Sequence, residues 1–398
     1  MTSSTPELTK ALNAAADSSV QASNEERLAL IAACDKLKAR LESPMEATLR
    51  ILFSPYHSIV LRLAVDMKIF DAAAELSADG KDIRLDDLVS KVEMEPLLVL
   101  RVVRFLAALK IFNEVGKATY KTTPLAAAYV SGSVISHAIV HITSQNWTVA
   151  QLPAYFEKKG YRNPSDAYAG PFQYAHDTDL HCFDWLATQP RLQASFNVIM
   201  GISRTLGDEA WFEYFPASSK LTGKSESEPL VVDIGGGVGH HLIALKKHCP
   251  SLTGKLIVQD IPAVVDNAKD LPAGIEVMKH DFFTPQPVKH AKAYFLSYVL
   301  HDWPDKQSLQ ILGHIRDAMD DESVLLIHEN MLPEVGVDAF SASTDLAMMA
   351  NFSALDRTEQ QFITLLDQAG LELVNTWAPK GATKGVGRCL LETVPKKA

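Results

Sequence analysis

The residues best suited to chemistry in this sequence lie in one glycine-rich stretch, Asp233-Ile-Gly-Gly-Gly-Val-Gly239. Gly235, Gly236 and Gly237 permit positive φ angles and a close approach of backbone to ligand, because no Cβ stands in the way. The spacing differs from the Gly-x-Gly-x-x-Gly loop that receives a dinucleotide pyrophosphate. A carboxylate entering the loop at Asp233 suits an amino-bearing or cationic ligand better, and an ordinary tight turn is the alternative.

Acidic, aromatic and imidazole side chains follow the strands that are predicted downstream. Asp260 ends the strand after the loop, where a carboxylate can bridge a ribose diol, and Asp281 with Phe282 ends the next. The acceptor oxygen and ring face of that pair suit an aminated heterocycle. His301-Asp-Trp-Pro-Asp and Glu329 follow two further strands. Because the carboxyl ends of parallel strands share one sheet edge, these groups are expected to form one site.

Strands and helices alternate from residue 229 onward, which predicts an α/β fold with a doubly wound, mostly parallel sheet. The predicted strands are 229–234, 255–259, 275–279, 293–296, 323–327, 371–378 and 388–392. The predicted helices between them are 242–247, 263–270, 307–319 and 359–369.

The first 205 residues are predicted to be mostly helical. Residues 1–45 form a helical arm, partly disordered, that is too short to bury itself and is expected to pack on a partner subunit. Residues 46–205 begin with helices and a hairpin at 111–123, the order of a winged helix. The third helix, 96–109, is apolar, whereas a helix that reads DNA bases carries polar side chains.

Bulk composition argues against several classes of protein. A net charge of −10 over 398 residues is unsuited to a nucleic-acid surface. No apolar run reaches membrane-spanning length and the polar start lacks a signal peptide, so a cytoplasmic protein without a membrane anchor is expected. The four scattered cysteines lack metal-ligand spacing, and no metal is predicted. His240, His241 and His280 are expected only to face solvent.

The glycine loop, the Asp281-Phe282 pair and Leu300-His-Asp-Trp-Pro-Asp305 together resemble the class I S-adenosylmethionine-dependent O-methyltransferases. The likeness is greatest to the dimeric plant and fungal branch that methylates hydroxyls of secondary metabolites, and it runs from about residue 45 to the end. The resemblance implies a Rossmann-like S-adenosylmethionine-binding catalytic domain over 206–398 and a winged-helix dimerisation and substrate-lining domain over 46–205. A homodimer through the N-terminal domain and a small, largely apolar, phenolic or polyketide-like substrate are likewise implied.

The same resemblance implies roles for individual residues. Cofactor contacts would come from Asp233, Gly235, Gly236, Gly237, Asp260, Asp281, Phe282, Ser297 and Trp303. His301 would be the general base, since an unperturbed pKa of about 6.5 suits proton removal from a hydroxyl. Glu329 and Asp356 would orient its imidazole. The acceptor pocket would be lined by Asn146, Trp147, Phe196, Met200, Met348 and Phe352.

Two departures from the family pattern keep a second class of enzyme open. Asp356 replaces the glutamate of the family's Glu-Arg-Thr segment, and Ser297 stands where a basic residue is common. A fungal sub-branch binds S-adenosylmethionine without transferring its methyl and uses the sulfonium as a fixed charge for dehydration or pericyclic ring formation. Residues 181–190 and 284–287 are similar to that sub-branch, in which His141 would act with the His301 and Asp302 pair. A cofactor-binding protein without turnover is the remaining possibility.

Overall fold

The computed structural model describes residues 5–17, 23–203, 209–266 and 271–397. The chain divides into two compact units, Met1–Ser131 and Gly132–Ala398, each described separately below. The disorder expected at the start of the arm falls partly on residues 1–4 and 18–22, which lie outside the described residues. No helix within the described ranges is long and apolar enough to cross a membrane.

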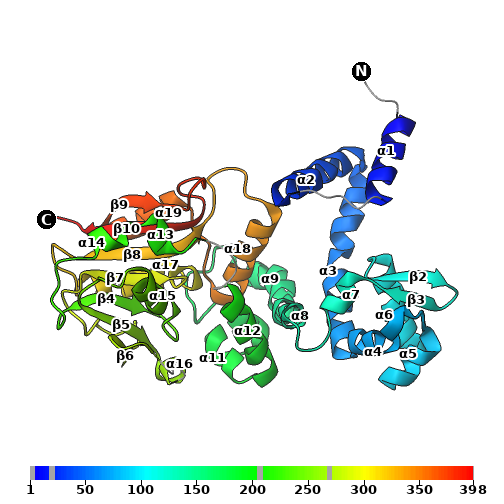
Figure 1. The fold of residues 1–398 in the computed structure, drawn as a ribbon, viewed down its shortest axis with the longest axis horizontal. Coiled ribbons are helices and arrows are strands. Elements are labelled where there is room, and N and C mark those ends of the chain that lie inside the picture. The colour runs from blue at the N-terminus through cyan, green and yellow to red at the C-terminus, as the bar shows by residue number, and fades with distance from the viewer. Residues whose placement is uncertain (1–4, 18–22, 204–208, 267–270, 398) are drawn as a thin grey trace. The chain divides into compact units, whose positions relative to one another are not determined.

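The first unit is helical with a small three-stranded sheet (Figure 1). Its elements are α1 (Thr5–Asp17), α2 (Asn24–Leu41), α3 (Pro44–Asp66), α4 (Ile69–Leu76), η1 (Ala78–Gly80), β1 (Ile83–Arg84), α5 (Leu85–Val92), α6 (Pro96–Ala108), β2 (Phe112–Gly116), β3 (Thr119–Thr122) and α7 (Pro124–Ala128). The strand order β1-β3-β2 makes an antiparallel wing. α2 and α3 each begin with a capping box, which satisfies N–H groups at the start of the helix.

Apolar side chains in the first unit are divided between a core and an exposed set. Val102, Val103 and Leu106 of α6 are buried, as its apolar sequence predicts. α2 buries none of its residues.

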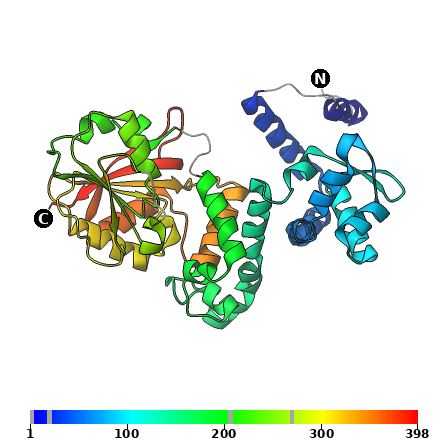
Figure 2. The ribbon, with the colours of Figure 1, turned by 60° about the horizontal axis from the view of Figure 1, so that its bottom comes forward.

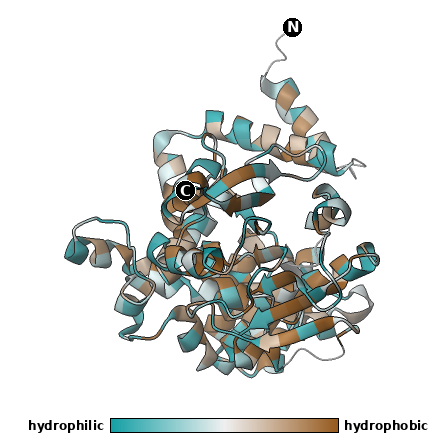
Figure 3. Ribbon diagram, turned by 90° about the vertical axis from the view of Figure 1, so that its left-hand side faces the viewer, coloured by the Kyte–Doolittle hydropathy of each residue, from teal (hydrophilic) through white to brown (hydrophobic). Residues whose placement is uncertain are grey.

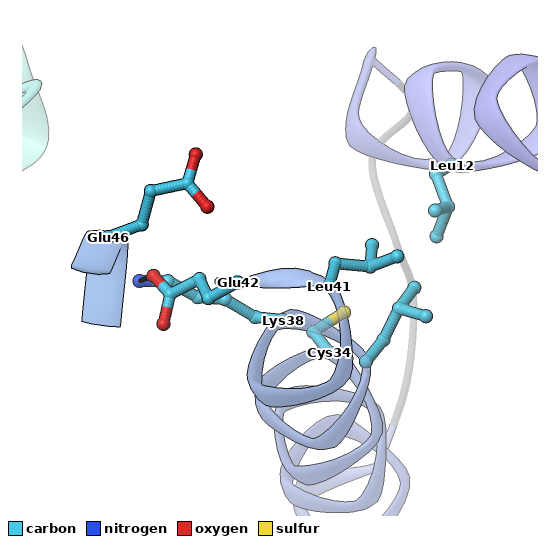
Figure 4. Close-up of a pocket in the computed structure, with 7 residues that line it drawn as sticks. Leu12, Cys34, Lys38, Leu41, Glu42 and Glu46 are labelled. Carbon is cyan, nitrogen blue, oxygen red and sulfur yellow. Dashed lines mark ion pairs between the residues drawn. The ribbon is translucent and has the colours of Figure 1, made fainter. Parts of the chain in front are cut away.

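A hollow of about 550 Å³ lies between α1, α2 and the start of α3 (Figure 4). Its lining consists of Leu12, Cys34, Leu37, Lys38, Leu41, Glu42 and Glu46.

Helices open the second unit and one later helix returns to join them. They are α8 (Val134–Ser144), α9 (Asn146–Lys159), α10 (Pro171–His176), α11 (Cys182–Ala187), α12 (Pro190–Ser203), α13 (Trp211–Tyr214) and α14 (Ala217–Lys220). α18 (Ala339–Phe352), orange in Figure 2, packs against α9 and α10, although more than 160 residues separate them from it. This return places C-terminal side chains beside the N-terminal helices of the unit.

A seven-stranded sheet follows, in the order β6-β5-β4-β7-β8-β10-β9. Its strands are β4 (Pro229–Ile234), β5 (Lys255–Asp260), β6 (Ile275–Lys279), β7 (Ala293–Ser297), β8 (Val324–Met331), β9 (Leu371–Trp377) and β10 (Gly387–Pro395). The connecting helices are α15 (His240–His248), α16 (Pro262–Val265), η2 (Leu300–Asp302), α17 (Asp305–Arg316) and α19 (Glu359–Gln368). Only β10 runs antiparallel to its two neighbours. The predicted fold class is confirmed.

Apolar cores cover both faces of the sheet along its inner strands, which explains the apolar runs in β4, β5, β7 and β8 (brown segments in Figure 3). Tyr294 and Leu296 join a core with helices α17 and α19, whereas Phe295 packs with α13 and α15 on the other face. The chain leaves β4 toward β5 and β6 and then returns to β7 on the other side of β4. Ligands of such sheets bind at this switch point, outside the carboxyl ends of β4 and β7.

Candidate active site

The glycine loop joins β4 to α15 at the switch point. Gly235, Gly237 and Gly239 have φ angles of 70°, 62° and 86°, which side-chain-bearing residues rarely adopt. A Cβ on Gly235 would lie 3.0 Å from Val299 Cγ2 and 3.8 Å from Phe282 Cε1. The loop therefore needs glycine both for its conformation and for its close packing against the ends of two other strands.

Two carboxylates lie directly at this loop. Asp233 is fully buried, and a Cβ on Gly236 would come within 2.6 Å of its Cγ. Asp260 Oδ2 accepts a hydrogen bond from Gly237 N at 2.9 Å, and its Oδ1 accepts one from Ile261 N at 2.8 Å. A carboxylate oxygen has two lone pairs, so this type of side chain can accept more than one hydrogen bond, as a ligand's hydroxyls would require.

Asp281 and Phe282, which are predicted to hold a heterocycle, lie next to a cluster of aromatic side chains. Asp281 is exposed, and its Oδ1 accepts from Phe283 N at 2.9 Å, which fixes the turn after β6. The Phe282 ring meets the buried Trp303 ring edge-on, with centroids 5.9 Å apart. Phe283, which sequence reasoning missed, meets the same indole at 4.7 Å.

His301 lies on η2, directly after β7, and two carboxylates flank its ring. Its Nε2 is 3.5 Å from Asp302 Oδ1, and its Nδ1 is 3.7 Å from Asp356 Oδ1. The Asp356 side chain is 7% exposed, while that of His301 remains 27% exposed. Asp356 therefore reaches the imidazole even though its side chain is one methylene shorter than that of glutamate.

Glu329 is buried at the end of β8 and holds the backbone of the same turn. Its Oε1 accepts from the N–H groups of Val299, Leu300 and His301 at 3.1, 2.9 and 3.4 Å. Its Oε2 is buried and has no hydrogen-bond partner among the described residues. Burial raises the pKa of Glu329, against the opposing effect of the His301 charge. These contacts make Glu329 a support for the turn that carries His301.

The protonation state of His301 follows from its acidic surroundings. Burial by itself lowers the pKa of the imidazole. The opposite effect of Asp302, Asp356 and Glu329 is larger, and the resulting pKa is about 10. These acidic neighbours therefore favour the protonated form of the ring.

Arg357 is a functional residue that sequence reasoning missed. Its side chain is 1% exposed, and its guanidinium donates to Leu300 O at 2.8 Å, Trp303 O at 3.0 Å and Asp305 Oδ1 at 2.7 Å. It therefore clamps the segment that contains His301 from the side opposite Glu329. Its position next to Asp356 in the sequence was the only available signal.

A second polar group lies at the carboxyl end of β7. Ser297 Oγ is 2.9 Å from Nδ1 of the buried His328, whose pKa is lowered by burial. The His241 ring lies 5.3 Å from the Phe295 ring and 6.0 Å from the His328 ring. The expectation that His241 only faces solvent is therefore wrong, because the first turn of α15 directs it toward the sheet.

Aromatic rings from several elements form a continuous series in the second unit, here called the aromatic wall. It consists of His141, Phe196, Phe183, Phe352, His181, Trp303 and Phe282, each with its ring centroid within 6 Å of the next. His141 is half-buried, and burial lowers its pKa. The sequence analysis singled out residues 181–190 but assigned no individual role to His181 or Phe183. The wall joins the predicted acceptor pocket to the predicted adenine site.

The other residues that are predicted to line the acceptor pocket differ in how deeply they are buried. Asn146, Met200 and Met348 are half-buried, on α9, α12 and α18. Trp147 is 57% exposed, and its indole N–H donates to Ala175 O at 2.8 Å. Within the described ranges, no group of three or more His, Cys, Asp or Glu residues is arranged to hold a metal ion.

Comparisons with known proteins agree with this geometry. Family profiles described as the O-methyltransferase domain and its dimerisation domain match residues 163–372 and 49–132. Demethylsterigmatocystin 6-O-methyltransferase of Aspergillus flavus is 34% identical over 344 residues, 86% of this chain and 87% of the relative. A structure of LepI with S-adenosylmethionine is 29% identical, with a TM-score of 0.80 and 98% of each chain covered. A structure described as a pericyclic reaction enzyme is also 29% identical, with a TM-score of 0.78 and coverage of 98% and 99%.

A mostly parallel sheet with a glycine loop after its central strand and acids at neighbouring strand ends defines a methyltransferase fold. The chain belongs to the O-methyltransferase family, and its cofactor is S-adenosylmethionine. The described residues fit that molecule. Gly235, Gly236 and Gly237 present no Cβ, Asp233 and Asp260 place carboxylates at the loop, and Phe282 contributes an aromatic ring.

Replacing Arg357 tests the clamp. Arg357→Met leaves the carbonyls of Leu300 and Trp303 without their donor, so we expect the free energy of unfolding to fall by about 2–4 kcal/mol. Asp305→Asn is the matched control, because Asp305 is 61% exposed and its loss should cost less than about 1 kcal/mol. Urea denaturation measures both, and equal losses would contradict the clamp.

The pH dependence of stability tests the state of His301. Its folded pKa of about 10 lies above the unfolded value, so its contribution is complete below about pH 6.5 and is lost as pH rises through 10. The difference in unfolding free energy between wild type and His301→Asn should therefore shrink from pH 6 to pH 10. Denaturation at pH 6, 8 and 10 measures it, and a constant difference would show that the ring is neutral.

Proposed function

We propose that this enzyme methylates a hydroxyl of a small, flat, largely apolar metabolite, with His301 as the general base. The observation that carries the role of His301 is its pairing with Asp356 at 3.7 Å, on a turn directly after β7 at the switch point of the sheet. A base oriented by a carboxylate is the arrangement that hydroxyl activation requires.

The aromatic wall supports a flat acceptor of the phenolic or polyketide-like class. Ring faces bind planar apolar molecules through dispersion and burial of surface. The Aspergillus flavus relative is named for the 6-O-methylation of demethylsterigmatocystin, and this name supports a secondary metabolite as the acceptor. Asn146, Met200 and Met348 would complete the pocket around the rings.

S-adenosylmethionine, when bound, supplies the methyl group as an electrophile on a positively charged sulfur. The residues Asp233, Gly235, Gly236 and Gly237 would bind its amino-acid portion, and Asp260 would accept from the ribose hydroxyls. Asp281 and Phe282 would bind the adenine, with Ser297 and Trp303 at the edges of the site.

His301 would take the proton of the acceptor hydroxyl, and this role requires a neutral ring. Asp302 and Asp356 hold the imidazolium in the ligand-free protein, where its pKa is about 10. A second positive charge brought into the same carboxylate cluster lowers the pKa of the first. The base is therefore expected to lose its proton as the cationic cofactor binds.

Proton release on binding tests this expectation. Calorimetric titration with S-adenosylmethionine in buffers of different ionisation enthalpy should show release approaching one proton at pH 8. Titration with S-adenosylhomocysteine, which lacks the sulfonium charge, should release much less, and His301→Gln should remove the difference between the two ligands. Equal proton release with both ligands in wild type would contradict the proposal that the positive charge of the cofactor displaces the proton of His301.

Activity tests the base directly. His301→Ala should lower the rate of S-adenosylhomocysteine formation by about 10²–10⁴-fold, the usual contribution of a general base. His240→Ala, on the exposed face of α15, is the control and should be unchanged. Normal methylation by the His301 variant would remove it from this role.

A second function is favoured by two observations. Acidic neighbours that include Asp302 raise the pKa of His301 to about 10, while burial lowers the pKa of His141 on the aromatic wall. If His301 kept its proton with the cofactor bound, one cationic and one neutral imidazole could polarise a substrate without methyl transfer. The pericyclic reaction enzyme has a similar fold. Conversion of a substrate with no S-adenosylhomocysteine formed would establish that function.

The dimerisation profile over 49–132 supports a homodimer through the first unit. Leu52 and Phe53 on α3 are 64% and 56% exposed, as expected for residues that a second copy covers. Light scattering should show a dimer for wild type and a monomer for the double variant Leu52→Glu, Phe53→Glu. Ile142→Glu is the control, since Ile142 is 58% exposed but lies on α8 in the second unit. If the double variant had the same molar mass in solution as wild type, this face of α3 would be excluded as the dimer interface.

A further inference from the structure

His181 is the most deeply buried imidazole of the aromatic wall. It is 2% exposed and stacks on the indole of Trp303 with centroids 4.6 Å apart and planes 15° apart. The rings of Tyr168, Phe183 and Phe352 surround it at 5.5, 5.3 and 5.8 Å. Its position lies between the ring of Phe352, in the predicted acceptor pocket, and Trp303, which extends to the adenine site.

The hydrogen bonds of His181 define which nitrogen carries the proton. Nδ1 accepts from Phe183 N at 3.3 Å, at the start of α11, so this nitrogen is unprotonated. Burial lowers the pKa of the ring to about 4, so the imidazole is neutral and its proton is on Nε2. Nε2 is buried and has no hydrogen-bond partner in the ranges that the structure describes.

A buried N–H without an acceptor destabilises a protein, whereas a phenylalanine could form the same ring stack without that cost. A ligand packed on the wall can supply the missing acceptor. The rings around His181 are apolar or neutral, so an ionised carboxylate placed among them would be desolvated without a cation. A neutral oxygen fits this position better.

We propose that His181 donates a hydrogen bond from Nε2 to a neutral carbonyl or ether oxygen of the methyl acceptor. This inference rests on the proposed function and narrows its substrate class. The enzyme would prefer planar aromatic hydroxyl compounds that carry a second oxygen, and His181 would be a specificity-determining residue beside the base.

Binding of two matched compounds to the protein saturated with S-adenosylhomocysteine tests the proposal. The pair is 2-hydroxyfluorenone and 2-hydroxyfluorene, which differ in the ketone oxygen. Wild type should bind the ketone about 10–100-fold more tightly, the range that one buried hydrogen bond gives. His181→Phe keeps a ring on Trp303 but lacks the donor, and it should bind both compounds within about threefold of each other.

A second variant separates the hydrogen bond from folding. His181→Asn keeps a side-chain acceptor for the start of α11 but lacks the ring donor, and it should also lose the preference for the ketone. Both variants should bind S-adenosylhomocysteine as wild type does. Weakened S-adenosylhomocysteine binding with the ketone preference retained would assign the N–H to the cofactor and overturn the proposal.

The remaining outcomes distinguish the inference from the function on which it rests. If wild type binds S-adenosylhomocysteine but shows no preference for the ketone, or binds neither compound, the role of His181 is wrong and methyl transfer is unaffected. If wild type fails to bind S-adenosylhomocysteine, the proposed function itself fails.

Discussion

Glu329 Oε1 accepts the N–H groups of three successive residues, Val299, Leu300 and His301, and the rest of the site depends on this convergence. Arg357 holds the carbonyls of Leu300 and Trp303 from the other side. The turn is thus fixed through its backbone by two buried, oppositely charged groups. Its side chains remain available, so the imidazole can face carboxylates and the indole can face the aromatic wall without either having to hold the turn in place.

The acidic side chains around His301 form a negatively charged cluster. This cluster can interact either with the protonated imidazole or with a cationic ligand. Asp302, Asp356 and Glu329 place three carboxyl groups near one imidazole, and Glu329 is buried. Without a cation such a cluster would be unfavourable, because desolvated like charges repel each other. A protonated His301 ring supplies such a cation. In the proposed function, the same groups that orient the ring would therefore also control whether it can act as a base.

Local sequence patterns were sufficient for the sheet, the glycine loop and the strand-end residues, since each depends on composition within a few positions. The family resemblance implied a contact between His301 and Asp356, but local patterns could not establish it, because it depends on how closely α18 and the following loop approach η2. Phe183, His181 and Arg357 were missed for a related reason. His181 and Phe183 contact the ring of Phe352, more than 100 residues later, and Arg357 contacts residues more than 50 positions earlier. An isolated aromatic or arginine residue carries no local signal of burial. His241 was misjudged because its position on α15 relative to the sheet is a tertiary property.

The antiparallel strand β10 pairs with β8 from Gly387 to Thr393 and sets Cys389 opposite Glu329. The strand that carries Glu329 therefore has its full set of ladder hydrogen bonds only once residues beyond 386 have been synthesised and have left the ribosome. During translation β8 is an unpaired edge, and apolar edges of this kind associate with other chains. Completion of the sheet beside Glu329 is consequently a late event in biosynthesis, and chains that lack β10 would expose one edge of β8.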